Sequence, residues 1–226
     1  MLRARRGEIL IYSDIGCPWA SLAIHRLHLA RERAGLIDQV SLDHRSFPLE
    51  LINERPTPRS TLEKEVRAIE EIEPDLGWSY WDEEEYRYPV TMLPALEAVQ
   101  AAKQQGLRAS EELDQELRGA FFGRSRCISL HHEIVAAARG CPSVDVDELE
   151  AALVSGGARK VLFDLRRAAD GPDVKGSPHL FLADGSDFHN PGITFGWEGD
   201  PERGTVVIEK DYPAVYGEIV ERAAAS

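Results

Sequence analysis

Cysteine is scarce in this sequence. The 226 residues contain three cysteines, Cys17, Cys127 and Cys141. An odd and widely spaced set does not fit the even disulfide frameworks that hold small secreted proteins together. We therefore expect no structural disulfides.

Long apolar runs are also lacking. No stretch approaches the roughly 18 residues needed to cross a bilayer. The N-terminal segment 1–7 is basic, but the apolar run after it is short and is interrupted by Ser13 and Asp14, which argues against a signal peptide. The sequence predicts a cytoplasmic protein with no membrane partner.

Positive charge is in deficit. Lys and Arg number 26 against 39 Asp and Glu, which gives a formal net charge of -13 at pH 7. Such a chain repels phosphate backbones and anionic lipids, so neither nucleic acid nor a membrane surface is expected as a partner. With 43% hydrophobic residues, the chain can bury one substantial core that also carries an inserted subdomain.

The N-terminal region predicts a strand followed by a helix. Residues 8–15 form a short β-rich run between two glycines, typical of a buried strand. Pro18 suits the first turn of a helix, and apolar residues at helical spacing continue until Gly35. This pattern places Cys17 at the N-terminus of that helix.

The middle of the chain predicts a second strand over residues 40–47 and then an acidic stretch, residues 63–85. We interpret this stretch as a solvated lid or loop with aromatic anchors rather than as a specific recognition site. Its aromatic residues are Trp78, Tyr80, Trp81, Tyr86 and Tyr88. Helical spacing follows in residues 95–102, 113–121 and 149–153, the last after the capping residues Asp145 and Asp147.

The C-terminal third returns to a mixed pattern. A helix is predicted over residues 158–169, two strands over 179–182 and 187–189 joined by an Asp-Gly hairpin, and a terminal helix over 214–224. Residues 191–205 are rich in Gly and Pro, and residues 206–208 fit a last strand or an extended segment.

This order of elements is that of an α/β protein with a thioredoxin-like fold and an inserted helical subdomain. The thioredoxin-like domain is predicted to be discontinuous, with residues 1–60 and 155–226. Residues 61–154 would hold the acidic loop and the inserted helical subdomain.

Three motifs carry a resemblance to a known family. They are Ser-Asp-Ile-Gly-Cys-Pro-Trp at 13–19, Ala-Phe-Phe at 120–122 and Gly-Ser-Pro-His-Leu-Phe at 176–181. Together they resemble DsbA-like proteins, in particular the FrnE-type and 2-hydroxychromene-2-carboxylate isomerase branch, over nearly the whole chain. The resemblance implies that Cys17 is the catalytic thiol and that Pro18 and Trp19 belong to the substrate site.

The placement of Cys17 favours a reactive thiol over a small buried hydrophobe. A thiol reacts as its thiolate, and the free N–H groups and dipole of a helix N-terminus stabilise that anion. Redox members of the family carry a second cysteine where this chain has Ala20. The usual dithiol cycle is therefore excluded, and glutathione, another protein thiol or a distant cysteine would have to resolve a mixed disulfide.

The resemblance also implies a substrate-binding segment at residues 177–179. Pro178 matches the family's cis-proline, and the backbone of Ser177 would pair with an extended substrate or with glutathione. His179 stands where relatives often carry a small polar residue. A protonated His179 near Cys17 would lower the pKa of the thiol or donate a proton, unless strand alternation turns the ring away, and both alternatives stay open.

The other candidate residues are interpreted as structural. Cys127 and Cys141 have no CxxC companion and are taken as core or surface thiols. His131, His132 and Glu133 lack a metal-binding spacing, so no metal site is predicted. No cofactor is expected, although glutathione is a candidate co-substrate.

Three functions are compatible with these residues. The first is a thiol-disulfide oxidoreductase or monothiol exchange protein that acts through Cys17 on a protein or glutathione disulfide. The second is a glutathione-dependent transferase or isomerase of the kappa-class or chromene-carboxylate isomerase type, although the Ser-Asp-Arg-like motif of those relatives is not matched by residues 209–213. The third is a non-catalytic thioredoxin-fold binding protein.

Overall fold

The protein is built around a four-stranded sheet with the strand order β2-β1-β3-β4. The computed structural model describes residues 2–79, 81–201 and 203–226. In the sheet, β1 (Glu8–Ser13) pairs in parallel with β2 (Ser41–Ser46) and antiparallel with β3 (His179–Phe181), which pairs antiparallel with β4 (Asp187–His189). A separate two-stranded sheet joins β5 (Ile193–Glu198) and β6 (Thr205–Asp211).

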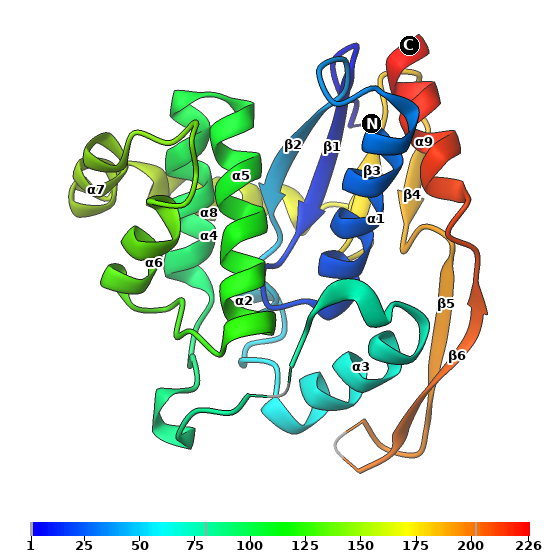
Figure 1. Ribbon diagram of the computed structural model, residues 1–226, viewed down its shortest axis with the longest axis horizontal. Coiled ribbons are helices and arrows are strands. Elements are labelled where there is room, and N and C mark those ends of the chain that lie inside the picture. The colour runs from blue at the N-terminus through cyan, green and yellow to red at the C-terminus, as the bar shows by residue number, and fades with distance from the viewer. Residues whose placement is uncertain (1, 80, 202) are drawn as a thin grey trace.

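Helices cover both faces of the sheet (Figure 1). They are α1 (Pro18–Ala34), α2 (Leu49–Ile52), α3 (Arg59–Ile72), α4 (Leu93–Ala102), α5 (Leu107–Arg118), α6 (His131–Ala138), α7 (Val146–Ser155), α8 (Gly157–Ala169) and α9 (Val215–Ala225). Short 3-10 turns lie at Pro74–Leu76, Glu85–Arg87 and Lys103–Gln105, and a π-helical turn, Gly119–Gly123, extends α5. The predicted α/β class and element order are confirmed.

Strand β1 is buried on both faces, which explains its continuous apolar run. Ile9 and Ile11 point into a cluster with α1 and α9, whereas Leu10 and Tyr12 point to the opposite face and join Leu165 of α8. Side chains alternate along a strand, so neighbouring apolar residues serve two different clusters. Because β1 is packed on both faces, the point at which the chain leaves the strand toward α1 is held in place.

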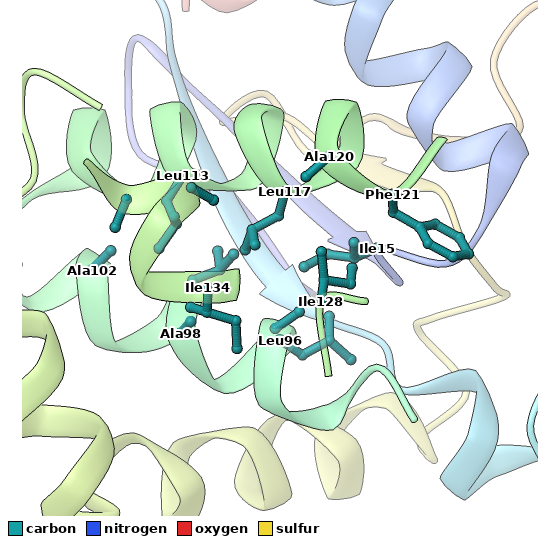
Figure 2. Packing of buried hydrophobic residues seen from close by; sticks show 14 of the residues in the cluster. Ile15, Leu96, Ala98, Ala102, Leu113, Leu117, Ala120, Phe121, Ile128 and Ile134 are labelled. Atoms are coloured by element: carbon teal, nitrogen blue, oxygen red, sulfur yellow. The ribbon is translucent and has the colours of Figure 1, made fainter. Parts of the chain in front are cut away.

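Helices α4 to α8 lie together on one side of the sheet in Figure 1, and α1 and α9 lie on the other. Figure 2 shows the packing inside this helical layer, where Ile15 from the loop after β1 belongs to the same cluster as Leu96, Leu113 and Ile134. Helix α8 packs into this layer through Leu162 and onto the sheet through Leu165.

The domain boundaries at 60/61 and 154/155 stay a prediction. Within the described residues, no helix is both long and apolar enough to cross a bilayer.

Several elements, including the short helix α2, were missed or misjudged in the sequence. The acidic stretch is not one loop, because residues 59–72 form α3 with Leu62, Val66 and Ile69 buried along one helical face. Helix α6 was not predicted, nor was β5, whose strand lies in the Gly- and Pro-rich stretch. Of the aromatic residues in the acidic stretch, Trp78 stacks on Phe122 and Trp81 meets Tyr88 and Phe121 edge-on or tilted; Tyr80 lies outside the described residues.

A buried arginine connects the helical layer to the loop between β1 and α1. Arg118 of α5 is 4% exposed and makes a bidentate ion pair with Asp114, at 2.7 and 3.0 Å. Its remaining N–H groups donate to the Asp14 carbonyl oxygen at 2.9 Å, to Ser21 Oγ at 2.8 Å and to Ser13 Oγ at 3.0 Å. The guanidinium therefore holds three points around Cys17 to a single helix.

Two histidines lie beside this network. Burial lowers the pKa of His28 to about 4, although Glu111 opposes the shift. His28 Nδ1 contacts Arg31 Nη2 at 2.8 Å. Burial also lowers the pKa of His44, whose two ring nitrogens have no hydrogen-bond partner. Both rings are therefore neutral at pH 7.

We expect Arg118→Met to lower the free energy of unfolding by about 3–5 kcal/mol, because it leaves a buried carboxylate without its partner. Urea denaturation at pH 7 measures this loss. The control is Arg124→Met, which breaks an exposed ion pair with Glu116 and should cost less than about 1 kcal/mol. Equal losses at the two positions would show that the buried network does not stabilise the fold.

We also expect His28→Asn to reduce the dependence of stability on acid. The unfolded chain protonates this ring near pH 6.5 and the folded protein only near 4, so stability falls as the pH drops through this window. Asparagine keeps an acceptor for Arg31 but takes up no proton, so between pH 7 and 4 the variant should lose roughly 2–3 kcal/mol less than the wild type. Urea titrations across this range test the difference, with the exposed His132→Asn as control; parallel curves for His28→Asn and the wild type would contradict it.

Candidate functional site

Cys17 lies at the N-terminus of α1, as the sequence predicts. It is the N-cap residue, Pro18 is the first helical residue, and Gly35 ends the helix in the left-handed conformation with φ 66°. The thiol donates a hydrogen bond to the carbonyl oxygen of Ser177, with Sγ and O 3.3 Å apart. The thiol of a residue near the N-terminus thus contacts a segment 160 residues later in the chain.

The peptide bond between Ser177 and Pro178 is cis, as the resemblance implies. Pro178 is buried behind the site, while Ser177 lies beside the thiol. The hydroxyl of Ser177 accepts a hydrogen bond from the Asp14 backbone N–H at 2.9 Å. Ser177 therefore contacts both ends of the segment 14–17, Asp14 through its hydroxyl and Cys17 through its carbonyl oxygen.

Asp14 shapes the turn before Cys17. Its Oδ1 accepts a hydrogen bond from the Gly16 N–H at 2.7 Å, and its Oδ2 accepts one from the Leu49 N–H at 2.8 Å. Burial raises the pKa of this carboxyl to about 6, although both hydrogen bonds act in the opposite direction. Asp14 thus holds the loop before Cys17 in place through its two carboxylate oxygens. This role of Asp14 was not predicted from the sequence.

The environment of the thiol opposes ionisation. Burial, followed by the charge of Glu65, raises the pKa of Cys17 to about 12, while the Ser177 side chain and the Ala20 backbone N–H lower it less. The helix N-terminus does supply an N–H to the sulfur, as expected, but the loss of hydration outweighs it. In the structure as it stands, Cys17 is a neutral thiol at pH 7.

An open cavity of about 560 Å³ lies beside the thiol. This size falls within the roughly 300–1,000 Å³ of cavities that hold small molecules. Its lining comes from the start of α1, from α2, α3 and the segment between them, from the loop before β3 and from the β5–β6 connection: Gly16, Cys17, Pro18, Trp19, Leu49, Asn53, Arg55, Pro56, Thr57, Pro58, Thr61, Glu65, Ser177 and Pro201. The cavity therefore contains four of the predicted site residues and the carboxylate of Glu65, which was not predicted.

Trp19 forms one wall of the site and is held by the hairpin that the sequence did not predict. Its ring stacks on Phe195 of β5, with the ring centroids 3.8 Å apart and an interplanar angle of 11°. Trp19 is 4% exposed and packs with Ile193 and Val206 of the same hairpin. The β5–β6 hairpin thus supports the residue that follows the Cys-Pro pair.

His179 lies outside the lining of this cavity, which supports the alternative in which the ring turns away from Cys17. His179 is fully buried, its Nδ1 accepts a hydrogen bond from the Lys175 N–H at 3.1 Å, and its Nε2 donates to Asp187 Oδ1 at 2.8 Å. Burial lowers the pKa of this histidine. The neutral ring fastens β3 to β4, as the strand-alternation alternative implies.

The remaining cysteines do not reach the site. Cys127 and Cys141 belong to the cluster of the helical layer, where Cys127 Sγ contacts Ser129 Oγ at 3.1 Å and Cys141 Sγ lies 3.6 Å from the Ala137 carbonyl oxygen. Cys17 belongs to a different cluster. All three are free thiols. The structure therefore does not bring a second thiol to Cys17.

Comparisons with solved structures find the same fold in several proteins. A probable DsbA oxidoreductase from Streptomyces coelicolor matches with a TM-score of 0.67 and 19% identity, over 97% of this chain and 90% of that one. A 2-hydroxychromene-2-carboxylate isomerase matches with 0.58 and 16%, over 80% and 87%. The cytosolic disulfide reductase DsbM from Pseudomonas aeruginosa, solved with GSH, matches with 0.57 and 14%, over 96% of each chain.

These identities are low, so the likeness to these structures shows the fold alone. No curated protein matches the sequence. Residues 8–200 match the family of the DSBA-like thioredoxin domain, which is most of the chain and includes both Cys17 and Pro178. The protein therefore belongs to the DSBA-like thioredoxin domain family.

Proposed function

We propose that this protein is a monothiol exchange protein of the thiol-disulfide oxidoreductase type, in which Cys17 forms a mixed disulfide with its substrate. The observation that carries the proposal is the 3.3 Å contact between Cys17 Sγ and the carbonyl oxygen before the cis-proline. A disulfide bound along residue 177 would lie against the sulfur that attacks it. The open cavity beside Cys17 gives such a substrate access.

In the proposed reaction the Cys17 sulfur attacks one sulfur of a substrate disulfide. The Cys17 thiol loses its proton as a new S–S bond forms and the old one breaks, and the departing sulfur leaves as a thiolate that takes up a proton in turn. Ala20 is fully buried and carries no thiol, so a second thiol from solution must attack the mixed disulfide and release Cys17. Glutathione is the thiol we propose for this step, and a protein or glutathione disulfide is the proposed substrate.

The cytoplasm is the compartment we propose for this reaction. Reduced small thiols are abundant there, so an enzyme with one thiol would be returned to its starting state. The three free cysteines agree with a reducing compartment.

The alternative of a kappa-class or chromene-carboxylate isomerase type of enzyme has less support from the residues before the last helix. Residues 209–211 belong to β6, and Asp211 makes a bidentate ion pair with Arg26 at 2.6 and 3.0 Å. This carboxylate is therefore engaged in packing α1 against β6. If Cys17 forms no mixed disulfide, the alternative of a non-catalytic binding protein is favoured.

The proposal predicts that oxidised glutathione modifies Cys17. We expect one glutathione adduct, located on Cys17 by mass spectrometry and removed by reduced glutathione. Cys17→Ser should abolish the adduct, whereas the variant with both Cys127→Ser and Cys141→Ser should keep it. An adduct confined to Cys127 or Cys141, or none at all, would exclude exchange at Cys17 and favour the binding-protein alternative.

A second prediction concerns the missing thiol. Ala20→Cys should allow Cys17 and residue 20 to close a disulfide and to release a bound substrate without an external thiol. Because a tethered group acts at a concentration on the order of millimolar, release with 0.1 mM glutathione should be roughly tenfold faster than in the wild type. Release of a fluorescent thiol from the mixed disulfide measures the rate. Equal rates would mean that the fold does not present residue 20 to the Cys17 sulfur.

A further inference from the structure

Glu65 occupies a position on α3 that the helix otherwise uses for burial. Leu62, Val66 and Ile69 form the apolar face of this helix, and Glu65 follows Leu62 by three positions on the same side. Glu71, on the opposite side of the helix, is exposed. A carboxylate on the packed face of an amphipathic helix loses hydration, so its presence there calls for a physical reason.

This face of α3 borders the cavity at Cys17. Glu65, Cys17 and Trp19 line the same open cavity, and α3 packs on both α1 and β6. Glu65 is the carboxylate among the described lining residues, and Arg55 is the cation. The charge of Asp14 also raises the pKa of the thiol, but the two carboxylate oxygens of Asp14 already accept hydrogen bonds from Gly16 and Leu49. Glu65 is therefore the carboxylate of the cavity that is available to the thiol.

The indole of Trp19 provides a second observation. Its N–H is buried and has no hydrogen-bond partner, yet it lies near the Glu65 carboxylate and stabilises the charge there. Burial outweighs this effect and raises the pKa of Glu65 to about 7. Near neutral pH this carboxyl can both take up and release a proton.

We propose that Glu65 is the proton acceptor for the Cys17 thiol. The proton leaves Cys17 Sγ for a Glu65 carboxylate oxygen, directly or through one water molecule, as the sulfur attacks a disulfide. The new S–S bond forms while the substrate S–S bond breaks, and the departing thiolate takes its proton from Glu65 or from solvent. This inference deepens the proposed exchange function and rests on it.

The need for an acceptor follows from the state of the thiol. Cys17 is buried and neutral at pH 7, and a neutral thiol is a poor nucleophile. A fixed negative charge at Glu65 makes ionisation harder, because it repels a thiolate across the cavity. A Glu65 that accepts the proton becomes neutral in the same step, so the repulsion disappears when the thiolate forms.

These two roles predict opposite effects of Glu65→Gln, which removes the charge and the acceptor but keeps the shape. If Glu65 acted only through its charge, the variant would lower the pKa of Cys17 and react faster. If Glu65 accepts the proton, the variant should react more slowly by roughly tenfold or more at pH 7–8, since a positioned base contributes about 10²–10⁴ in favourable cases.

The experiment measures the rate of Cys17 modification from pH 5 to 10 with two reagents, iodoacetamide and oxidised glutathione. In the wild type the rate should rise with the ionisation of Glu65 near pH 7 and then level off. In Glu65→Gln this rise should vanish and leave only the increase at high pH from the thiol itself. Glu65→Asp should restore part of the rate, and Glu71→Gln, an exposed acid on the same helix, should match the wild type.

The two reagents separate this inference from the function on which it rests. Alkylation needs deprotonation of Cys17 but no disulfide, so wild-type alkylation that depends on Glu65 with no glutathione adduct would support the proton transfer and overturn only the exchange function. Glutathione adducts that form as fast or faster in Glu65→Gln would overturn the role of Glu65 and leave exchange intact. A Cys17 that neither reagent modifies would overturn both.

Discussion

The ion pair between Arg118 and Asp114 is the interaction on which the geometry of the site depends. Both side chains are buried, and a buried guanidinium is tolerated only when its N–H groups find acceptors. Arg118 finds them on the Asp14 carbonyl oxygen, Ser13 and Ser21, at both ends of the turn that carries Cys17. The helical layer is therefore bonded to the β1–α1 turn as well as packed on the sheet. A shift of α5 would move the turn and the thiol together.

The chemistry of the site is set by the same burial that stabilises the fold. Removing water raises the pKa of both the Cys17 thiol and the Glu65 carboxyl, since it disfavours whichever form is charged. The helix N–H groups favour the thiolate, but they do not compensate for the hydration that the buried sulfur loses. A proton that moves from the thiol to the carboxylate keeps the charge of the pair constant, so desolvation opposes this transfer less than it opposes the release of a proton to water.

Much of this arrangement could be predicted from the sequence, and the exceptions have physical causes. The strands and helices with regular spacing were predicted, as were the helix end at Cys17 and the cis bond before Pro178. Helix α3 was mistaken for a loop because its acidic composition hid the buried face of Leu62, Val66 and Ile69. Strand β5 was missed because its glycine and neighbouring prolines mask the alternation of Ile193, Phe195 and Trp197. The direction of His179 depends on the register in which β3 pairs with β1 and β4, and this pairing is not determined by the local sequence.

Among its described residues the site contains one cysteine, Cys17, so the tasks of a second active-site cysteine must be met in other ways. In a dithiol protein the second cysteine both resolves the substrate and affects the ionisation of the first. Here Ala20 is fully buried in the cluster that joins α1 to α3 and the β5–β6 hairpin, and Cys127 and Cys141 lie in another cluster, so neither task falls to a thiol of this chain. Resolution is left to a thiol from solution, which requires an open approach, and the cavity at Cys17 is open. Ionisation of Cys17 then depends on the groups around that cavity. One of them is Glu65 of α3, the helix that was predicted to be a loop. The features that replace the second cysteine are therefore an open cavity and a carboxylate. The segment between β2 and α4 supplies the carboxylate and part of the cavity lining.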